Sequence, residues 1–325
     1  GTNAGTLTLN MTRAALIPYA IKGWELWNNT EKWLFGGVGT RKVNGLSLAF
    51  TEEEEELLFK RVEARQAMGA PIKFISGRKA QLLEPGLNDS VRSAAWCNKD
   101  GFTIAYLTGH AFRRALKQEN VSVREYSKVN KIEIEKNYFK IIFENNEHLK
   151  AKRIVLAGGV WLEEMLNWLN VKIKIKCLIN QLIITERMPP VMKTVLSIAN
   201  GLLSLKQFDN GTVLIGGGWQ GIGDKKRGGV ESIPENLIGN IRLACHVIPK
   251  LRYGRMVRVW LGLEAETADA LPIIGKIPGI SNAYVIGSVH SGYASGPYMG
   301  WLLSQLIMEQ EPEMPLFDPN RLINK

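Results

Sequence analysis

The chain has 325 residues, of which 45% are hydrophobic and 22% charged, so its composition is that of a globular protein long enough to bury a core in one or two domains. Its three cysteines lie far apart without C-x-x-C spacing, which argues against a disulfide framework or zinc site and suits a reducing compartment. No apolar run approaches the roughly 20 residues that span a bilayer, and the N-terminus shows no signal pattern. We therefore expect a soluble, cytoplasmic protein without membrane insertion.

The net charge of +10 permits an anionic partner, but the basic residues are dispersed. The densest run, VKIKIKC at 171–177, alternates lysine with valine and isoleucine, which predicts a half-solvated strand. No nucleic-acid-binding motif accompanies the charge, so we expect no nucleic acid partner.

The N-terminal third alternates helical and strand patterns. Apolar residues recur at helical spacing between 7 and 34, and LSLAF at 46–50 predicts a strand. Thr51 and Glu54 form a capping-box pattern that begins a helix. The glutamate run after Thr51 is therefore interpreted as a solvated first turn and not as a metal site.

The middle of the chain predicts a helix at 104–118, followed by strands at 121–126, 128–135, 138–143 and 152–157. In RIVLAGGVW, a continuous apolar run predicts a buried parallel strand, and Gly158 and Gly159 predict a tight turn into a helix. Such turns lie at the carboxyl ends of strands, where open α/β sheets bind ligands.

The following block predicts a largely antiparallel sheet inserted into the α/β layer, with strands at 171–187, 202–207, 211–217 and 255–263 and a helix at 234–248. Residues 216–221, GGGWQG, fit the G-x-G-x-x-G dinucleotide pattern, but turn residues follow where a helix is required. We interpret this stretch as a strand end with glycines at a close approach.

The stretch VIGSVHSGYASGPYMGWLLSQLI at 285–307 predicts a strand, a loop of small residues and a helix. A helix N-terminus presents unpaired N–H groups and partial positive charge, and the small residues would let a flat ligand approach the backbone. A glycine-rich turn that closes a helix on a sheet explains the same pattern.

Several motifs occur in the order found in one known family. GTNAGTL at 1–7, KVNKIEIE, IVLAGGVW, NQLIITE, TADALPIIGKIP and the stretch just described resemble segments of the FAD-dependent amino-acid oxidases and dehydrogenases of the D-amino-acid oxidase, glycine oxidase and sarcosine oxidase type. The resemblance covers almost the whole chain. It implies an α/β plus α+β fold, in which a mainly antiparallel substrate domain is inserted into an interrupted Rossmann-like FAD-binding domain.

That resemblance implies a division into 1–40, 100–170 and 262–325 as the FAD-binding domain, and 41–99 and 171–261 as the substrate domain. It also implies FAD as cofactor, with the helix at 296–307 directed at the flavin N1/O2 edge. The implied flavin contacts are Asn3, Ala4, Gly5, Val129, Gly158, Trp161, His290, Ser291, Gly292, Tyr293, Ala294 and Ser295. His290 could face the flavin or serve as a structural hydrogen-bonding group.

The activity implied is oxidation of an amine C–N bond of a small amino acid or amine, by hydride transfer to flavin N5. Trp260 and Trp219 could wall the substrate cavity or belong to the core. Where glycine-oxidase-like relatives carry a carboxylate-binding arginine, this chain has Glu264. Arg258, which shares a strand face with Trp260, could replace that arginine, or Glu264 could select a cationic substrate.

The chain departs from the family in beginning after the strand–GxGxxG–helix unit, which we interpret as a fragment or truncated form. Such a chain could bind FAD weakly, and a second copy, as in a homo-oligomer, could cover part of the exposed sheet edge. The alternative to an amine-oxidising flavoenzyme is a non-catalytic flavin-fold subunit, or a fragment that does not bind FAD alone.

Overall fold

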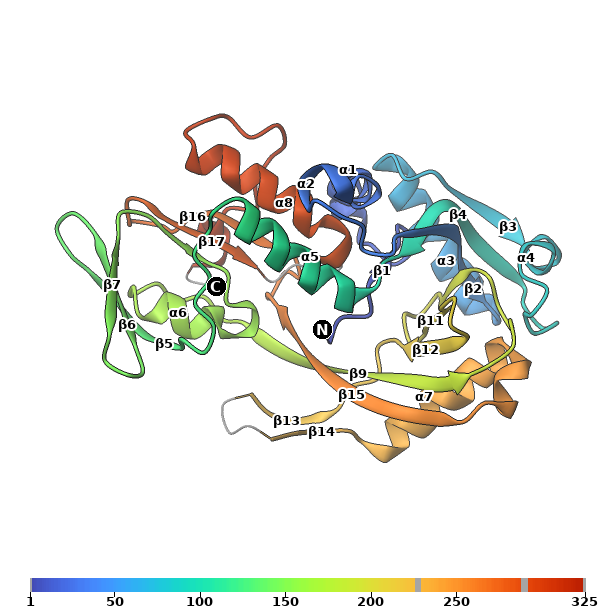
Figure 1. Ribbon diagram of the computed structural model, residues 1–325. Helices are drawn as coiled ribbons and strands as arrows, with labels where there is room; N and C mark the ends of the chain where they lie inside the picture. Colours follow the sequence, from blue (N-terminus) through green and yellow to red (C-terminus); the bar gives the residue numbers. More distant parts are fainter. Residues whose placement is uncertain (1, 226–228, 288–291, 324–325) are drawn as a thin grey trace. The chain divides into compact units, whose positions relative to one another are not determined.

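A computed structural model describes residues 2–225, 229–287 and 292–323 (Figure 1). The chain forms two compact units. Unit 1 comprises Gly1–Arg114, Ile179–Leu263 and Tyr293–Ser295, and unit 2 comprises Ala115–Leu178, Glu264–Gly292 and Gly296–Lys325.

Unit 1 is built on a large sheet with helices packed against it. Its elements are β1 (Thr6–Leu7), the 3-10 helix η1 (Ala14–Leu16), α1 (Ile17–Asn28), α2 (Thr30–Trp33), β2 (Arg41–Ala49), α3 (Glu52–Ala67), β3 (Ile72–Ser76), α4 (Gly77–Leu83), β4 (Ser93–Phe102), most of α5 (Ala105–Gln118), β9 (Lys176–Arg187), β10 (Val195–Ile198), β11 (Ser204–Gln207), β12 (Thr212–Gly216), β13 (Ile222–Asp224), β14 (Gly229–Glu231), α7 (Pro234–Val247), η3 (Pro249–Tyr253) and β15 (Met256–Glu266).

The large sheet has the strand order β1-β4-β2-β10-β11-β12-β9-β15, with β3 paired to β4 outside this path. The pairs β1/β4, β2/β4, β10/β11, β11/β12 and β9/β12 are antiparallel, whereas β2/β10 is parallel. The predicted, mainly antiparallel inserted sheet is therefore present.

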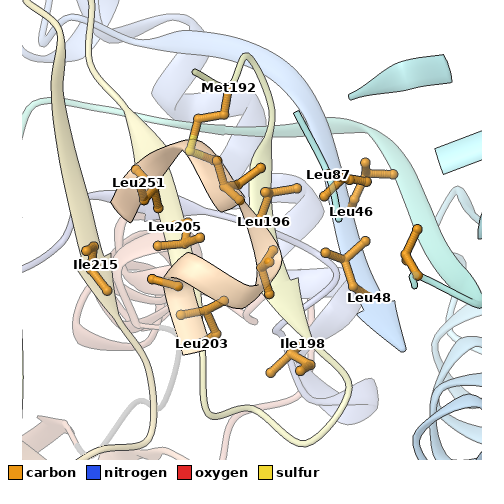
Figure 2. Close-up of a cluster of buried hydrophobic side chains, with 14 of the residues drawn as sticks. Leu46, Leu48, Leu87, Met192, Leu196, Ile198, Leu203, Leu205, Ile215 and Leu251 are labelled. Atoms are coloured by element: carbon orange, nitrogen blue, oxygen red, sulfur yellow. The ribbon is translucent and has the colours of Figure 1, made fainter. Parts of the chain in front are cut away.

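The main hydrophobic core lies on one face of this sheet, where α7 packs on β12. Figure 2 shows leucine and isoleucine side chains of β2, β10, β11 and β12 gathered there with Leu251 of η3. Because side chains alternate along a strand, Leu205 on β11 enters this core and Lys206 points to the opposite face.

Unit 2 contains two smaller sheets. Its elements are β5 (Val129–Ile134), β6 (Phe139–Phe143), β7 (His148–Ala151), β8 (Ile154–Leu156), η2 (Gly159–Trp161), α6 (Leu162–Asn167), β16 (Ile273–Lys276), β17 (Ala283–Gly287), most of α8 (Gly292–Ile307) and η4 (Pro319–Leu322). One sheet has the order β5-β6-β7 and the other the order β16-β17-β8.

Several predictions from local pattern are confirmed. Thr51 is the N-cap of α3, where its hydroxyl accepts the Glu54 N–H at 3.2 Å, and the Glu54 carboxylate accepts the N–H of Phe50 at 2.8 Å. The apolar run at 154–157 contributes β8, which pairs parallel to β17. Val155 on β8 is nevertheless 44% exposed, so the strand is less buried than its apolar sequence predicts.

Other predictions are wrong. Residues 121–126 form no strand, and 171–175 alternate buried and exposed side chains without belonging to β9. The helix predicted at 296–307 begins four residues earlier, at Gly292, and contains Pro297. The strands β1, β3, β4, β7, β10, β13, β14 and β16 were not predicted. No helix among the described residues is long and apolar enough to cross a membrane.

Candidate functional site

The N-terminal segment Thr2–Thr6, predicted to pass the flavin, is fixed along its length by unit 1. The Asn3 side chain accepts the Gly5 N–H at 2.7 Å, which forms a local turn. Gly5 has φ +70°, and a Cβ there would lie 2.4 Å from the Thr103 carbonyl oxygen. The Gly5 carbonyl accepts the Thr103 N–H at 2.8 Å, so glycine at this position allows the close approach of two backbones.

The same segment meets β15, which carries two of the predicted substrate residues. Trp260 donates its indole N–H to the Thr2 carbonyl at 2.9 Å. A Cβ on Gly262 would lie 3.4 Å from the Thr2 hydroxyl oxygen, an ordinary van der Waals distance. The guanidinium of Arg258 lies over the Trp260 ring, 6.0 Å from its centre. The expected shared face of Arg258, Trp260 and Gly262 is thus observed. Trp219, in contrast, is partly buried and packs its ring on Gly239 of α7.

Tyr293, near the start of α8, belongs to unit 1 and makes its contacts there. Its hydroxyl lies 2.6 Å from the hydroxyls of both Thr103 and Thr108. Trp27 of α1 stacks on the Tyr293 ring at 4.9 Å and donates its indole N–H to the Tyr293 carbonyl at 2.7 Å. Burial raises the pKa of Tyr293. The Tyr293 side chain therefore holds the start of α8 against α1 and α5.

Ala294 and Ser295, which follow Tyr293, are buried. A Cβ on Gly23 of α1 would lie 1.9 Å from the Ala294 carbonyl oxygen, so α1 packs directly on this turn of α8. Gly292 opens the helix, and no acidic residue occupies its first turn. His290 and Ser291 lie outside the described residues.

The remaining predicted flavin residues belong to unit 2. Gly158 and Gly159 lead from β8 into η2 and α6, with φ +56° at Gly159. A Cβ at Gly158 would lie 2.2 Å from the Met165 sulfur, and Trp161 is 47% exposed. Val129 begins β5, opposite Phe143 of β6. The predicted tight turn between strand and helix is therefore present.

A buried carboxylate that was not predicted holds the chain immediately after β1. Asp100 accepts hydrogen bonds from the Thr8 hydroxyl at 2.6 Å, the Leu9 N–H at 2.8 Å and the Asn10 side-chain amide at 3.2 Å. Its burial, opposed by those hydrogen bonds, raises the pKa of Asp100. Burial and the neighbouring Asp100 also raise the pKa of the Cys97 thiol, so this cysteine is suited to packing and not to nucleophilic chemistry.

Glu264 lies on β15 beyond unit 1, is partly buried and has interaction partners. Among the described residues, no group of three or more histidine, cysteine, aspartate or glutamate side chains could hold a metal ion. The candidate residues thus offer hydroxyl, amide, aromatic, cationic and carboxylate groups, which can bind and orient an organic ligand.

Residues 1–306 match the model of a protein family described as FAD dependent oxidoreductase, DAO. The chain belongs to this family. It is therefore an FAD-dependent oxidoreductase, as its motifs predicted.

Two curated relatives illustrate the range of the family. An opine oxidase subunit from Rhizobium meliloti is 26% identical over 261 residues, covering 78% of this chain and 67% of the relative. Glycine oxidase of Geobacillus kaustophilus is 22% identical over 294 residues, covering 89% of this chain and 76% of the relative.

Solved structures share the fold. The crystal structure of glycine oxidase from Geobacillus kaustophilus superposes with a TM-score of 0.88 at 20% identity, covering 99% of this chain and 87% of that one. L-proline dehydrogenase from P. horikoshii gives a TM-score of 0.87 at 24% identity, covering 99% and 86%. The predicted fold class, an FAD-binding domain with an inserted sheet domain, is confirmed. The predicted boundaries of the FAD-binding and substrate domains stay a prediction, because the two compact units are defined by contacts within the chain and not by what each part binds.

The residues described fit the cofactor of the family. The segment Thr2–Gly5 presents small side chains on a fixed backbone, and its Asn3 is exposed. At the carboxyl end of β8, Gly159 has no atom within 4 Å of the place that a Cβ would take, so its backbone is open to a ligand. The first turn of α8 carries Gly292, Ala294 and Ser295 beside Tyr293, and it has no acidic side chain that would repel a negatively charged group.

Proposed function

We propose that this chain oxidises the C–N bond of an amino acid or secondary amine to an imine. FAD, when bound, supplies the electron acceptor, because N5 of its ring takes the hydride from the substrate α-carbon. The substrate amine must be neutral, so that its nitrogen lone pair forms the C=N bond as the C–H bond breaks. Water then hydrolyses the imine.

The observation that carries the proposal is the hydrogen bond between Trp260 and the Thr2 carbonyl. It joins the strand predicted to face the substrate with the segment predicted to pass the flavin, inside one compact unit. Trp260 supplies a flat apolar surface, and its indole N–H is already used by Thr2. Its role in the proposal is therefore to fix the segment and exclude water, and not to move a proton.

Arg258 and Glu264 give the proposal two versions that differ in substrate charge. A guanidinium stacked over Trp260 can bind a carboxylate with two parallel hydrogen bonds, which favours an amino acid. A partly buried carboxylate at Glu264 favours a substrate with a second cationic group.

The first experiment is the visible absorption spectrum of the purified chain with and without added FAD. Flavin bands that remain after gel filtration would support the proposal, and an anaerobic screen of amino acids and secondary amines for bleaching would then identify the substrate class. Bound flavin that no amine bleaches would favour a non-catalytic flavin-fold subunit. A chain that takes up no FAD would contradict the proposal and favour the alternative of a fragment that does not bind FAD alone.

The second experiment separates the two versions. Arg258→Ala is expected to raise the KM for an amino acid by about 10- to 100-fold with a smaller change in kcat, because a charge-assisted contact to the substrate is lost. Glu264→Gln is expected to raise the KM only for substrates that carry a second cationic group. Arg242→Ala, on the exposed face of α7, is the matched control and should leave KM unchanged. An unchanged KM in Arg258→Ala would remove the arginine version.

A further inference from the structure

Lys206 on β11 is a lysine whose charge is enclosed by the sheet. Its side chain is only 2% exposed, and its ammonium donates to the Ala4 carbonyl and, at 2.7 Å, to the Thr6 hydroxyl. It lies 5.4 Å from the centre of the Phe102 ring and 5.7 Å from that of Phe208. No carboxylate of the described residues pairs with it.

Such a lysine is expensive to bury. Removing an ammonium from water costs several kcal/mol, and in this chain two neutral oxygen acceptors and two aromatic faces offset that cost in place of an anion. Burial accordingly lowers the pKa of Lys206 well below its usual range. A leucine or methionine would fill the same volume without this penalty, so the interactions of the ammonium explain why a lysine is suited to the position.

The contacts of Lys206 join parts of unit 1 that the sheet order separates. Strands β4, β2 and β10 lie between β1 and β11 in that order. Lys206 nevertheless reaches Thr6 of β1, which is possible because the sheet curls and brings these strands together. On the far side, the same segment meets β15 through Thr2 and Trp260. The segment Thr2–Thr6 therefore closes the curled sheet from inside, and Lys206 is bonded to its centre.

We propose that Lys206 is a positioning residue, which holds the Ala4–Thr6 backbone in the shape that receives the flavin. This inference rests on the proposed function, since it takes Asn3, Ala4 and Gly5 as flavin contacts. Neighbouring anchors hold Thr2 and Gly5, but Lys206 bonds the carbonyl between them. Without the Lys206 ammonium, Thr2 and Gly5 keep their hydrogen bonds, but the Ala4 carbonyl between them loses its donor.

Lys206→Met tests this, because methionine keeps an unbranched apolar stem and removes the ammonium. In the FAD-free chain, we expect amide hydrogen exchange in the peptide covering residues 2–7 to accelerate at least about tenfold, while α7 is unaffected. Lys73→Met is the matched control, because Lys73 also lies over an aromatic ring, 5.7 Å from the centre of Trp96, but is exposed. It should leave exchange in residues 2–7 unchanged.

A second pair of variants tests the link to the flavin without changing the lysine. Thr6→Val removes one acceptor of Lys206 at nearly constant shape, and Thr6→Ser keeps it. We expect the Kd for FAD, measured by fluorescence quenching, to rise about 10- to 100-fold in Lys206→Met and less in Thr6→Val, and to stay within about twofold in Thr6→Ser. If Lys206 were purely structural, replacing it would lower the melting temperature, but the Kd for FAD measured well below that temperature would stay unchanged.

The experiments distinguish failure of the proposed function from failure of the inference about Lys206. If the wild-type chain takes up no FAD, the proposed function fails, and hydrogen exchange alone decides whether Lys206 holds the segment. If Lys206→Met loses stability but keeps both the exchange pattern of residues 2–7 and the Kd for FAD, the inference is overturned. If Lys206→Met does not fold, Thr6→Val and Thr6→Ser still decide, because equal Kd values in these two variants contradict the inference.

Discussion

Replacing Gly45 with alanine tests whether Asp100 is a fixed point of unit 1. Gly45 lies on β2, where a Cβ would fall 1.9 Å from Oδ2 of Asp100 and 2.5 Å from its Cγ. The carboxylate therefore occupies the space that any side chain at position 45 would need. It also binds the chain directly after β1, through Thr8 and Leu9.

The magnitude follows from the distances. To reach an ordinary contact of 3.4 Å, the Asp100 oxygen must retreat by roughly 1.5 Å. That movement would break hydrogen bonds now 2.6 Å and 2.8 Å long, from Thr8 and Leu9. Each buried donor left without a partner costs about 1–3 kcal/mol, so we expect Gly45→Ala to lower the free energy of unfolding by about 3–5 kcal/mol.

Urea unfolding followed by tryptophan fluorescence measures this change, provided that the slope of the transition is unaltered. Gly109→Ala is the matched control in the same unit. Gly109 lies within α5, and no atom lies within 4 Å of the place that a Cβ would take, so alanine there should stabilise the helix by about 0.5–1 kcal/mol. The reasoning is refuted if Gly45→Ala unfolds within about 1 kcal/mol of the wild type.

Two further predictions concern hydroxyl and carboxylate groups. Tyr293→Phe should destabilise the chain by about 1–2 kcal/mol, because the hydroxyls of Thr103 and Thr108 lose a shared partner. Since burial raises the pKa of Tyr293, urea titrations at pH 7 and pH 9 should give the same loss, and a loss confined to one pH would contradict this. Burial opposes ionisation of Asp269, but hydrogen bonds, led by that from Arg321, outweigh it and lower the pKa of Asp269. The contribution of ionised Asp269 to stability is thus fully present above the ordinary pKa of aspartate and is lost as pH falls through the lowered pKa. The melting temperatures of wild type and Asp269→Asn should therefore converge toward pH 3. The contribution at pH 7 should be under about 1 kcal/mol because the pair is partly exposed, and a difference that persists at low pH would argue against the ion pair.

The elements that were predicted correctly are those whose signals are local. The capping box of Thr51 and Glu54 and the turn at Gly158 and Gly159 are each decided within a few residues, by hydrogen bonds and backbone angles that neighbouring side chains control. The family could also be identified from the sequence, because short motifs occurred in a fixed order along most of the chain.

Predictions that needed a distant partner were less successful. Residues 121–126 alternate as a strand would, yet Val121 and Val123 are 48% and 52% exposed and the segment pairs with no strand among the described residues. A strand without a partner leaves its hydrogen bonds to water and gains nothing from alternation. Strand β4, in contrast, carries Lys99, Asp100 and Gly101 within SAAWCNKDGF, so it lacks the pattern of a strand, but β1, β2 and β3 all pair with it.

Lys206 shows most clearly what alternation can and cannot predict. A strand was predicted at 202–207, and in the strand observed there Leu205 and Lys206 lie on opposite faces. A reader of the sequence alone would assign the lysine face to water. In the folded chain that face is enclosed, because the sheet curls until β1 and β11 share the same interior and Phe102 and Phe208 cover the ammonium. Curvature is a property of the whole sheet, so no window of the sequence reports it. A lysine in an amphipathic strand of a curled sheet is therefore a place where a polar residue can hold two distant segments together.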